Sequence, residues 1–324
     1  MKQPVQPMNN PSRSGRCSDH GRNRSRQRNQ NLADLAFDAG NYLLMSLVLV
    51  LIAYPLVYIL SASFSDPLRV ASGEMWLLPK GATLEGFERL FRYSEIWRGY
   101  ANTIYYTVFG TFFNLLVTIP CAYALSRKDF VGRSLIMTLF VITMFFSGGL
   151  VPTYLVVRDI GLINNRWMMI VGGATSAYNV VVSRTFFATS IPYELQEAGR
   201  IDGCTNYKLF GRIILPLSKP ILAVMAMFFG VGHWNEYFGA MIYLKDREIW
   251  PLQLILKEIL IQSRVAAEMA MQSSELLEGA AALARISEMI KYTSIVVSVI
   301  PMMALYVYMQ KYFVKGVMIG AIKG

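Results

Sequence analysis

The sequence predicts an all-α polytopic membrane protein with six transmembrane helices. Hydrophobic residues make up 54% of the 324 residues and charged residues only 16%, whereas about 25% of a soluble domain is charged. The charges also cluster between long neutral runs, many of them long enough to cross roughly 30 Å of hydrocarbon at about 1.5 Å per helical residue. This pattern is typical of a chain that crosses a membrane repeatedly.

Six apolar runs are the expected spans. The fourth is short, and the fifth carries His233 and Glu236 near one end, so the boundaries of these two are the least sharply defined. Prolines lie inside several runs, and membrane helices tolerate such kinks where neighbouring groups satisfy the freed backbone. The expected spans are Tyr42–Ser63, Asn102–Leu125, Ser134–Val157, Trp167–Ser183, Pro220–Leu244 and Tyr292–Gln310.

The distribution of basic residues predicts the orientation. Six spans put both termini on one side, and the segments expected there carry 18 of the 31 Lys and Arg residues against 7 acids. The opposite loops carry nearly equal numbers of both signs. Because the basic side of a membrane protein faces the cytoplasm, both termini are expected to be cytoplasmic, and the net charge of +10 is mostly a topology signal.

Residues 1–38 are expected to form a disordered cytoplasmic tail, because arginines alternate there with Ser, Asn and Gln. Contact with RNA or anionic lipid is the alternative to a solvated tail, and the topology favours the solvated tail, with no nucleic-acid partner. The tail lacks the apolar core and small-residue cleavage site of a signal peptide. The first apolar run is therefore expected to remain as a span.

The sequence predicts neither a metal site nor a catalytic site. Cys17, Cys121 and Cys204 show no CxxC spacing, and the two histidines, His20 and His233, lie in unrelated segments. A membrane-embedded enzyme would need a nucleophile with a base, or clustered ligands, within the spans. Asp is absent from all six expected spans, so this class is disfavoured.

The loop between the fourth and fifth spans, residues 190–216, is expected to form a helical hairpin. Ser190 is a candidate cap for its first helix, and Pro192 suits a first turn because its missing N–H needs no partner there. Glu194 and Glu197 follow near the positive end of the helix dipole. Ala198 and Gly199 offer a small-residue surface that suits docking into a groove of another protein; a plain loop on the bilayer surface is the alternative.

The second half of this hairpin depends on turn chemistry. Asp202-Gly203 is a turn pair in which glycine is free to adopt positive φ. Thr205 or Asn206 is expected to cap the second helix, which Pro216 is expected to end.

The spacing within the hairpin resembles the "EAA" loop of permeases in binding-protein-dependent ABC importers. The matching positions are Glu197-Ala198-Gly199, then Asp202-Gly203, then Ile213-x-Leu215-Pro216. Gly199 departs from the family's usual alanine, which weakens the first helix somewhat, and Cys204 departs from the usual small residue. The resemblance covers most of the chain after the first 35 residues and implies the type I ABC importer permease fold over residues 39–324.

Three segments are similar to the carbohydrate-importer branch of these permeases: Val180–Pro216, Trp234–Phe238 and Gln310–Gly316. Within that branch the chain is most similar to oligosaccharide permeases, including those for uronic-acid chains such as aldouronate and alginate. The resemblance implies a multi-pass protein of the bacterial cytoplasmic (inner) membrane, in contact with membrane lipid. The outer loop, residues 245–291, is long and mixes apolar helix-like stretches with charges, so it is expected to pack on the outer surface, where it either meets a substrate-binding protein or simply covers that surface.

The resemblance further implies partners that supply the energy. The sequence contains no Gly-Lys dipeptide and hence no P-loop, so the chain is expected to hold no cofactor, with ATP and Mg bound by a cytoplasmic ATPase dimer. The other implied partners are a second homologous permease, most often a different chain, and an extracytoplasmic solute-binding protein. The expected mechanism is alternating access driven by closure of the ATPase dimer.

The residues implied to contact the ATPase are Glu197, Ala198, Gly199, Arg200, Asp202 and Gly203. Arg200 and Arg212 are each a candidate to pair with acids on the ATPase, to be solvated or to face lipid phosphates.

The expected substrate path contains Trp234, Asn235, Glu236 and Tyr237. An acid within a membrane span suggests a function by default, whereas the aromatic residues suit equally an interfacial belt or helix packing. For a uronate substrate, Glu236 is expected to contact hydroxyls or an internal basic residue rather than the carboxylates.

Two rival functions stay open at this stage. A permease for another solute, such as a peptide or phosphate, would share the hairpin. A self-contained secondary transporter or ion channel is less favoured, because no internal repeat is evident.

Overall fold

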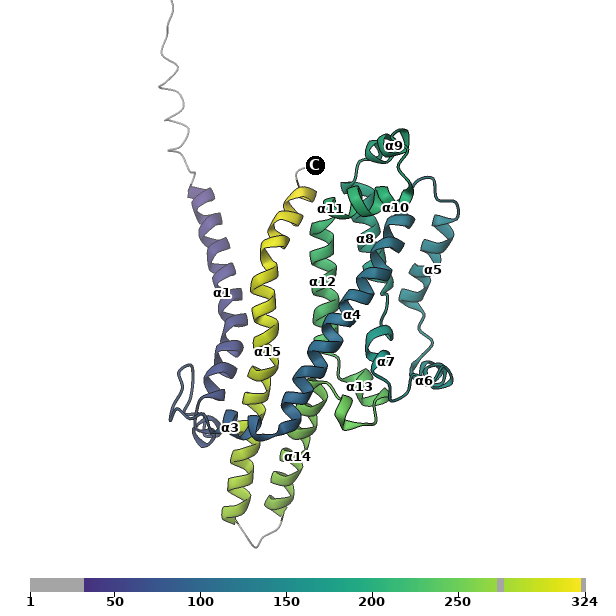
Figure 1. Ribbon diagram of the computed structural model, residues 1–324. Helices are drawn as coiled ribbons and strands as arrows, with labels where there is room; N and C mark the ends of the chain where they lie inside the picture. The colour runs from purple at the N-terminus through teal and green to yellow at the C-terminus, as the bar shows by residue number, and fades with distance from the viewer. Residues whose placement is uncertain (1–31, 273–276, 322–324) are drawn as a thin grey trace, which may run out of the picture. The chain divides into compact units, whose positions relative to one another are not determined.

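The computed structural model describes residues 32–272 and 277–321, and every regular element in these ranges is a helix (Figure 1), which agrees with the predicted all-α class. The longer helices are α1 Leu32–Ser63, α4 Ser94–Ser126, α5 Arg133–Phe145, α6 Leu150–Asp159, α8 Ala177–Ser190, α9 Tyr193–Ile201, α12 Lys219–Trp234, α14 Leu252–Gln272 and α15 Leu277–Ala321. The shorter ones are α2 Pro67–Ala71, α3 Glu85–Arg92, α7 Arg166–Val171, α10 Asn206–Leu209, η1 Phe210–Ile214, α11 Leu215–Leu217, α13 Phe238–Tyr243 and η2 Arg247–Ile249.

The chain divides into two units, residues 1–57 and residues 58–324. Within the first unit, α1 begins at Leu32, so the last residues of the expected tail are helical rather than disordered. The rest of that tail, residues 1–31, lies outside the described residues. The second unit contains the hairpin and the pocket described below.

Among the described residues, three helices are long and apolar enough to cross a membrane, and two bent helix pairs would raise the number to five. The three are Asp34–Ser63, Ser94–Ser126 and Ala282–Tyr308. The expected third span is instead two helices, α5 and α6, that meet at 117°. The expected fourth span is divided between α7 and α8, and the expected fifth span ends at Trp234 before a new helix, α13. Six unbroken spans are therefore not observed.

Glycines account for two of these breaks. Gly149 lies between α5 and α6 with φ of +82°, a conformation that interrupts a right-handed helix and that glycine adopts without a steric penalty. The pair Gly172-Gly173 follows α7 and separates it from α8. Membrane proteins place such irregular backbone where it is shielded by protein or lines a cavity, and Gly172 and Gly173 do line the pocket described below.

Helix α4 lies at the centre of the second unit and packs against α8, α12 and α14. At its C-terminal end, Ile119, Ala122 and Tyr123 join buried side chains of α8, α12 and the 190–216 hairpin in one core cluster. Near its N-terminal end, Ile96 joins Trp234 and the apolar face of α14 in a second cluster. One rigid helix therefore runs from the hairpin to α14 (Figure 1).

The crossing of α4 and α12 depends on a glycine. A Cβ atom added at Gly110 of α4 would lie 2.4 Å from the His233 ring of α12, closer than atoms can approach. A Cβ added at Gly230, on the facing surface of α12, would lie 3.7 Å from the Thr111 hydroxyl, an ordinary contact. Gly110 thus allows α12 to approach closely, as small residues do at membrane helix crossings.

We expect Gly110→Ala to destabilise the protein by about 1–3 kcal/mol through overpacking against His233. Gly230→Ala is the matched control. Both changes bring the same helix-propensity gain of up to about 1 kcal/mol, but only the Ala side chain at position 110 clashes with a neighbour, His233. The midpoint of thermal unfolding in detergent should fall for Gly110→Ala and stay level or rise for Gly230→Ala. Equal midpoints would show that the crossing is looser than the structure indicates.

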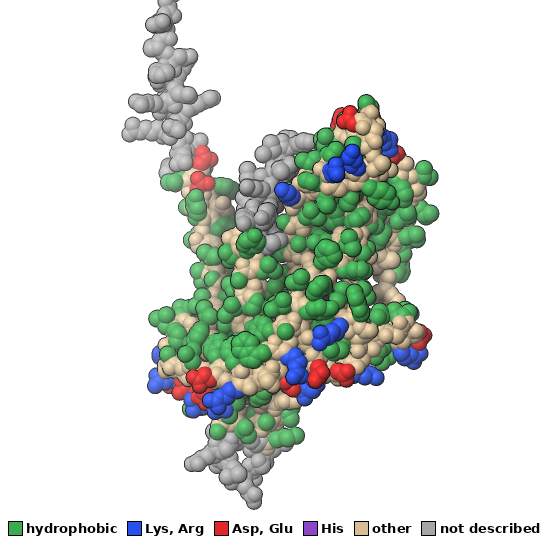
Figure 2. Space-filling view, in the orientation of Figure 1, with side chains coloured by type: hydrophobic (Ala, Val, Ile, Leu, Met, Phe, Trp, Pro, Cys, Tyr) green, Lys and Arg blue, Asp and Glu red, His purple; other side chains and the backbone are tan. Residues whose placement is uncertain are grey.

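The surface of the second unit is divided by charge. On the face shown in Figure 2, hydrophobic side chains fill a broad middle zone, and Lys, Arg, Asp and Glu side chains gather at its two ends. The exposed apolar residues in α4 and α15 include Phe109, Phe112, Met303 and Tyr306. An apolar zone bounded by charges is what lipid contact requires.

Candidate functional site

The turn of the 190–216 hairpin is a complete helix C-cap. Gly203 has φ of +68°, the Cys204 N–H donates to the Gly199 carbonyl (2.9 Å), and the Gly203 N–H donates to the Arg200 carbonyl (3.0 Å). This pair of bonds around a left-handed glycine is the Schellman motif. The expected Asp202-Gly203 turn is therefore present, and its backbone groups, otherwise orphaned at the end of α9, are satisfied.

The ends of the hairpin helices differ from the expectation. Ser190 ends α8 instead of capping α9, and Pro192 occupies the N-cap position of α9 without a side-chain cap bond. Thr205 does cap α10, accepting from the Lys208 N–H at 3.4 Å. Pro216 lies near the start of α11 and does not end the helical path, which breaks at Ser218. The turn just before Pro216, η1 Phe210–Ile214, is π-helical, and this irregular hydrogen-bond ladder allows the helical path to continue past the proline.

The exposed tip of the hairpin combines acids with apolar side chains. Glu197, Ala198, Asp202 and Gly203 are exposed, as are two large apolar residues next to them, Ile201 at 86% and Tyr207 at 91%. Single exposed apolar residues are common, but here two large ones lie on one small tip beside acidic groups, and aromatic residues are enriched at protein interfaces. The tip thus has the composition of a docking surface.

Gly199 is buried and is not part of that surface. A Cβ added there would lie 2.8 Å from Cδ1 of Leu209, whose side chain is 1% exposed. The sequence-based prediction of a surface position was wrong, because it ignored how closely α10 packs on α9. The glycine at this position allows the two hairpin helices to approach.

Arg200 contacts an acid within the chain. Its guanidinium pairs with Asp129, in the loop between α4 and α5. Asp129 also accepts two bonds from Arg127, at 2.9 Å from Nε and 2.8 Å from Nη2. Arg127 in turn donates to the Asn206 side chain of α10 at 2.9 Å. We call these four residues the Asp129 bridge; it ties the end of α4 to both helices of the hairpin.

The Asp129 bridge stays ionised at physiological pH. The hydrogen bond from Arg127 holds the pKa of Asp129 well below its usual range, against a smaller opposing effect of desolvation, and the same bond raises the pKa of Arg127. The folded pKa of Asp129 lies below its unfolded pKa of about 3.9. The stabilisation of the folded protein by ionised Asp129 is therefore fully present above the unfolded pKa and is lost only as pH falls through the lower, folded pKa. Attachment of the hairpin is thus expected to be independent of pH between about 5 and 8.

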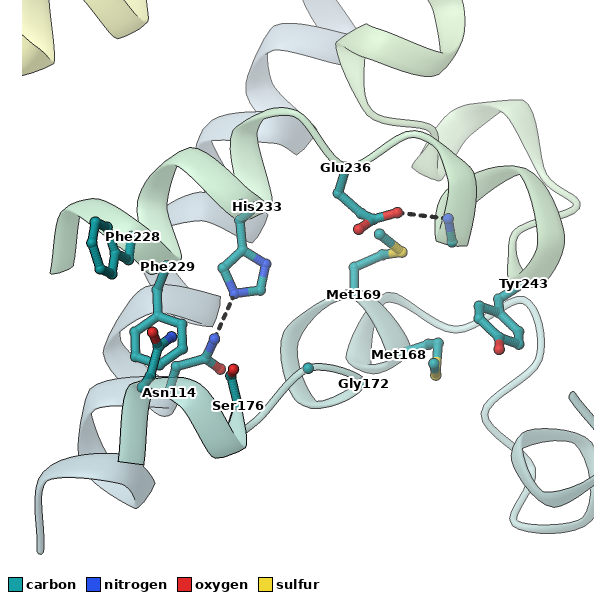
Figure 3. Close-up of a pocket in the computed structure, with 14 residues that line it drawn as sticks. Asn114, Met168, Met169, Gly172, Ser176, Phe228, Phe229, His233, Glu236 and Tyr243 are labelled. Atoms are coloured by element: carbon teal, nitrogen blue, oxygen red, sulfur yellow. Dashed lines mark hydrogen bonds between the residues drawn. The ribbon is translucent and has the colours of Figure 1, made fainter. Parts of the chain in front are cut away.

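A pocket of about 310 Å³ lies between α4, α7, α8, α12 and α13 (Figure 3). One side presents Phe228 and Phe229 of α12, and the other presents Met168 and Met169 of α7 and Tyr243 of α13. We call it the α4–α12 pocket. Its volume is at the small end of the ligand-pocket range, about 300–1,000 Å³, and its mixture of apolar walls with a few polar groups is typical of ligand sites.

The polar groups of the α4–α12 pocket come from three helices and the break after α12. Asn114 Nδ2 lies 3.2 Å from His233 Nε2, and Glu236 Oε1 accepts from the Gly239 N–H at 2.6 Å. Ser176 and Asn179, at the start of α8, complete the set. His233, which looked isolated in the sequence, therefore has a partner 119 residues away. The acid Glu236 was one sequence signal of this site, and the polar residues Asn114 and Asn179 inside two expected spans were two further ones.

The four residues expected in the substrate path lie in different places. Only Glu236 lines the α4–α12 pocket. Trp234 is 5% exposed, packs in the α14 core cluster and donates to the Ser298 carbonyl at 2.9 Å. Asn235 is exposed and bonds back to Val231, while the Tyr237 ring lies under the Lys257 ammonium at 4.1 Å. Their role in transport remains a prediction.

Comparison with known proteins places this geometry in a family. The model of the binding-protein-dependent transport system inner membrane component family matches residues 96–319. That range contains the hairpin, the Asp129 bridge and the α4–α12 pocket.

Individual relatives match nearly the whole chain. Protein LplC of Bacillus subtilis (strain 168) is 36% identical over 292 residues, which are 90% of this chain and 96% of the relative. The polygalacturonan/rhamnogalacturonan transport system permease protein YtcP of the same organism is 36% identical over 285 residues, 88% and 96% of the two chains. A crystal structure of a bacterial ABC transporter involved in the import of the acidic polysaccharide alginate matches with a TM-score of 0.75 and 33% identity, over 87% of this chain and 98% of that chain.

Proposed function

The chain belongs to the family of inner membrane components of binding-protein-dependent transport systems, and on that premise we propose that it carries oligosaccharides into the cell as the permease subunit of an ATP-driven importer. It is a transport component and not an enzyme, as its curated relatives are permease subunits. The observation that carries the proposal is the exposed hairpin tip, held in shape by the Gly203 cap and attached to α4 by the Asp129 bridge.

The names of the relatives support the substrate class. Two curated relatives are named as permease proteins of transport systems for polygalacturonan or rhamnogalacturonan and for arabino-oligosaccharides. The solved structure is of a transporter involved in the import of alginate. The first and last of these substrates are rich in uronic acids. We therefore extend the proposal to oligosaccharides that contain uronic-acid rings.

The proposed function includes three partners, and the hairpin supports the first of them. A cytoplasmic ATPase dimer, holding ATP and Mg, would receive the exposed tip formed by Ile201, Asp202 and Tyr207. A second, different permease would complete the membrane pathway, and an extracytoplasmic solute-binding protein would deliver the sugar. The excess of basic residues in these segments supports a cytoplasmic location for the hairpin and for both chain termini.

Purification from the native membrane tests this proposal. We expect the tagged protein to retain an ATPase and one further permease of different sequence in mild detergent, both identifiable by mass spectrometry. Reconstituted with its solute-binding protein, the complex should take up oligosaccharides only when ATP is supplied. Recovery of the chain alone, with uptake that follows an ion gradient and ignores ATP, would instead establish a self-contained secondary transporter.

A further inference from the structure

The α4–α12 pocket contains a buried acceptor with no donor. Asn114 is 2% exposed, its Nδ2 is engaged with His233, and its Oδ1 has no hydrogen-bond partner among the described residues. Buried polar atoms are nearly always satisfied, so one without a partner calls for an explanation such as a bound water or ligand. Because Asn114 lines the pocket, a hydroxyl group that reaches the pocket floor would supply the missing donor.

The other lining groups suit the same kind of ligand. His233 and Ser176 can each donate or accept according to tautomer and rotation, and the Ser176 side chain is not used to cap α8. Phe228 is 44% exposed and presents an apolar surface opposite Met168 and Tyr243 (Figure 3). A sugar ring has both features, since its hydroxyls exchange hydrogen bonds while its C–H faces pack against apolar side chains.

The charges in the α4–α12 pocket select between sugar types. Among its lining residues there is no Lys or Arg, and the single acid is Glu236. The Glu236 carboxylate accepts one backbone N–H and is half-buried. A uronate carboxylate placed here would lose water, find no cation and meet a like charge, each of which disfavours binding.

We propose that the α4–α12 pocket is a binding subsite for an uncharged, hydroxyl-rich sugar ring. The inference rests on the proposed function and narrows it: whatever acidic rings the transported oligosaccharide carries elsewhere, the ring held here is neutral. Asn114, His233 and Ser176 hold the hydroxyls, the aromatic and methionine side chains hold the ring faces, and Glu236 excludes a carboxylate.

The test uses two probes that differ only in charge: an oligogalacturonate, and the same oligosaccharide with every carboxylate reduced to the primary alcohol. The reporter is Gly173→Cys in an otherwise cysteine-free chain, in the assembled complex with its ATPase and second permease. Gly173 lines the pocket, is not one of the groups proposed to hold the hydroxyls, and an added Cβ there meets nothing within 4 Å. The rate of alkylation of this cysteine, measured against probe concentration, gives the concentration for half-protection. We expect protection by the reduced probe at concentrations at least tenfold lower than by the acidic probe.

Three variants in the reporter background locate the contacts. Asn114→Leu keeps the branched shape of the side chain but removes the amide, and should raise the half-protecting concentration of the reduced probe about tenfold. Thr118→Val is the matched control: Thr118 is one turn further along α4, fully buried and outside the pocket lining, so this change should have no effect. Glu236→Gln keeps the acceptor for Gly239 and should reduce the preference for the neutral probe.

The outcomes separate this inference from the proposed function. If neither probe protects the cysteine, if both protect equally, or if Asn114→Leu and Thr118→Val behave alike, the subsite is overturned, even where the wild-type complex takes up oligosaccharide with ATP. If the wild-type complex takes up no oligosaccharide at all, the proposed function fails instead. Protection by the neutral probe that weakens only in Asn114→Leu supports the subsite.

Discussion

Gly203→Val is expected to reduce ATP-driven uptake at least tenfold while leaving the chain folded in the membrane. The left-handed conformation at Gly203, with φ of +68°, is a genuine outlier for a β-branched residue and costs any L-residue about 1–2 kcal/mol. An added Cβ meets nothing within 4 Å, so the cost comes from the backbone alone. A cost of this size lowers the equilibrium constant for forming the correctly capped hairpin by about five- to thirtyfold.

Gly203→Asn is the matched control for this prediction. Asn has nearly the volume of Val but adopts the left-handed conformation more readily. ATPase recovered with the tagged permease, and ATP-driven uptake into vesicles, should both fall at least tenfold for Val and much less for Asn. Loss in both variants would mean that a side chain at this exposed position blocks the docking surface directly. Full retention in both would refute the hairpin as the contact with the ATPase.

The features of the hairpin that could be predicted from sequence are those set by adjacent residues. Asp202-Gly203 forms its turn and Thr205 caps the following helix because both depend on backbone chemistry within a few positions. The burial of Gly199 could not be predicted, because it depends on Leu209 of a different helix. Likewise, the Asp129 bridge joins residues more than 70 positions apart, and no local pattern indicates their pairing.

The spans show a similar division. Mean hydropathy located the membrane-crossing regions represented by α1, α4 and α15. Because it averages over a window of residues, it does not detect a break of one or two residues within a helix. The glycine pairs at 148–149 and 172–173 were visible signals of the breaks in the third and fourth expected spans. The α4–α12 pocket follows from those breaks, since the segment after α7 lines it. Its polar groups come from α4, α8 and α12, and only tertiary packing brings them together.

Asp129→Asn is expected to uncouple ATP hydrolysis from uptake. The structure attaches the hairpin to α4 through Asp129, which bridges Arg200 of α9 and Arg127 at the end of α4. Arg127 is 8% exposed, so loss of its carboxylate partner leaves a buried positive charge poorly compensated. The resulting destabilisation is large when both partners of an ion pair are buried. It is smaller here because Asp129 is itself exposed. Movement of the hairpin would then no longer be transmitted rigidly to α4.

The uptake measured per ATP hydrolysed distinguishes this effect from simple loss of the complex. We expect it to fall several-fold for Asp129→Asn, with the ATPase still bound because the Gly203 cap and the exposed tip are unchanged. Asp159→Asn is the control, since Asp159 forms an ion pair with Arg158 that is exposed on both sides and remote from the hairpin. A ratio equal to wild type in both variants would contradict the bridge.

The converse experiment joins the same two positions covalently. If α9 and the loop after α4 move as one body, a short crosslink between Asp129→Cys and Arg200→Cys should preserve uptake rather than block it, because the two side chains are already in contact. A crosslink that stops uptake reversibly would show that the hairpin slides against α4 during transport. Since α4 also carries Asn114 at the pocket and packs through Gly110 against His233, a rigid attachment gives movement of the hairpin a direct path to the groups proposed to hold the sugar.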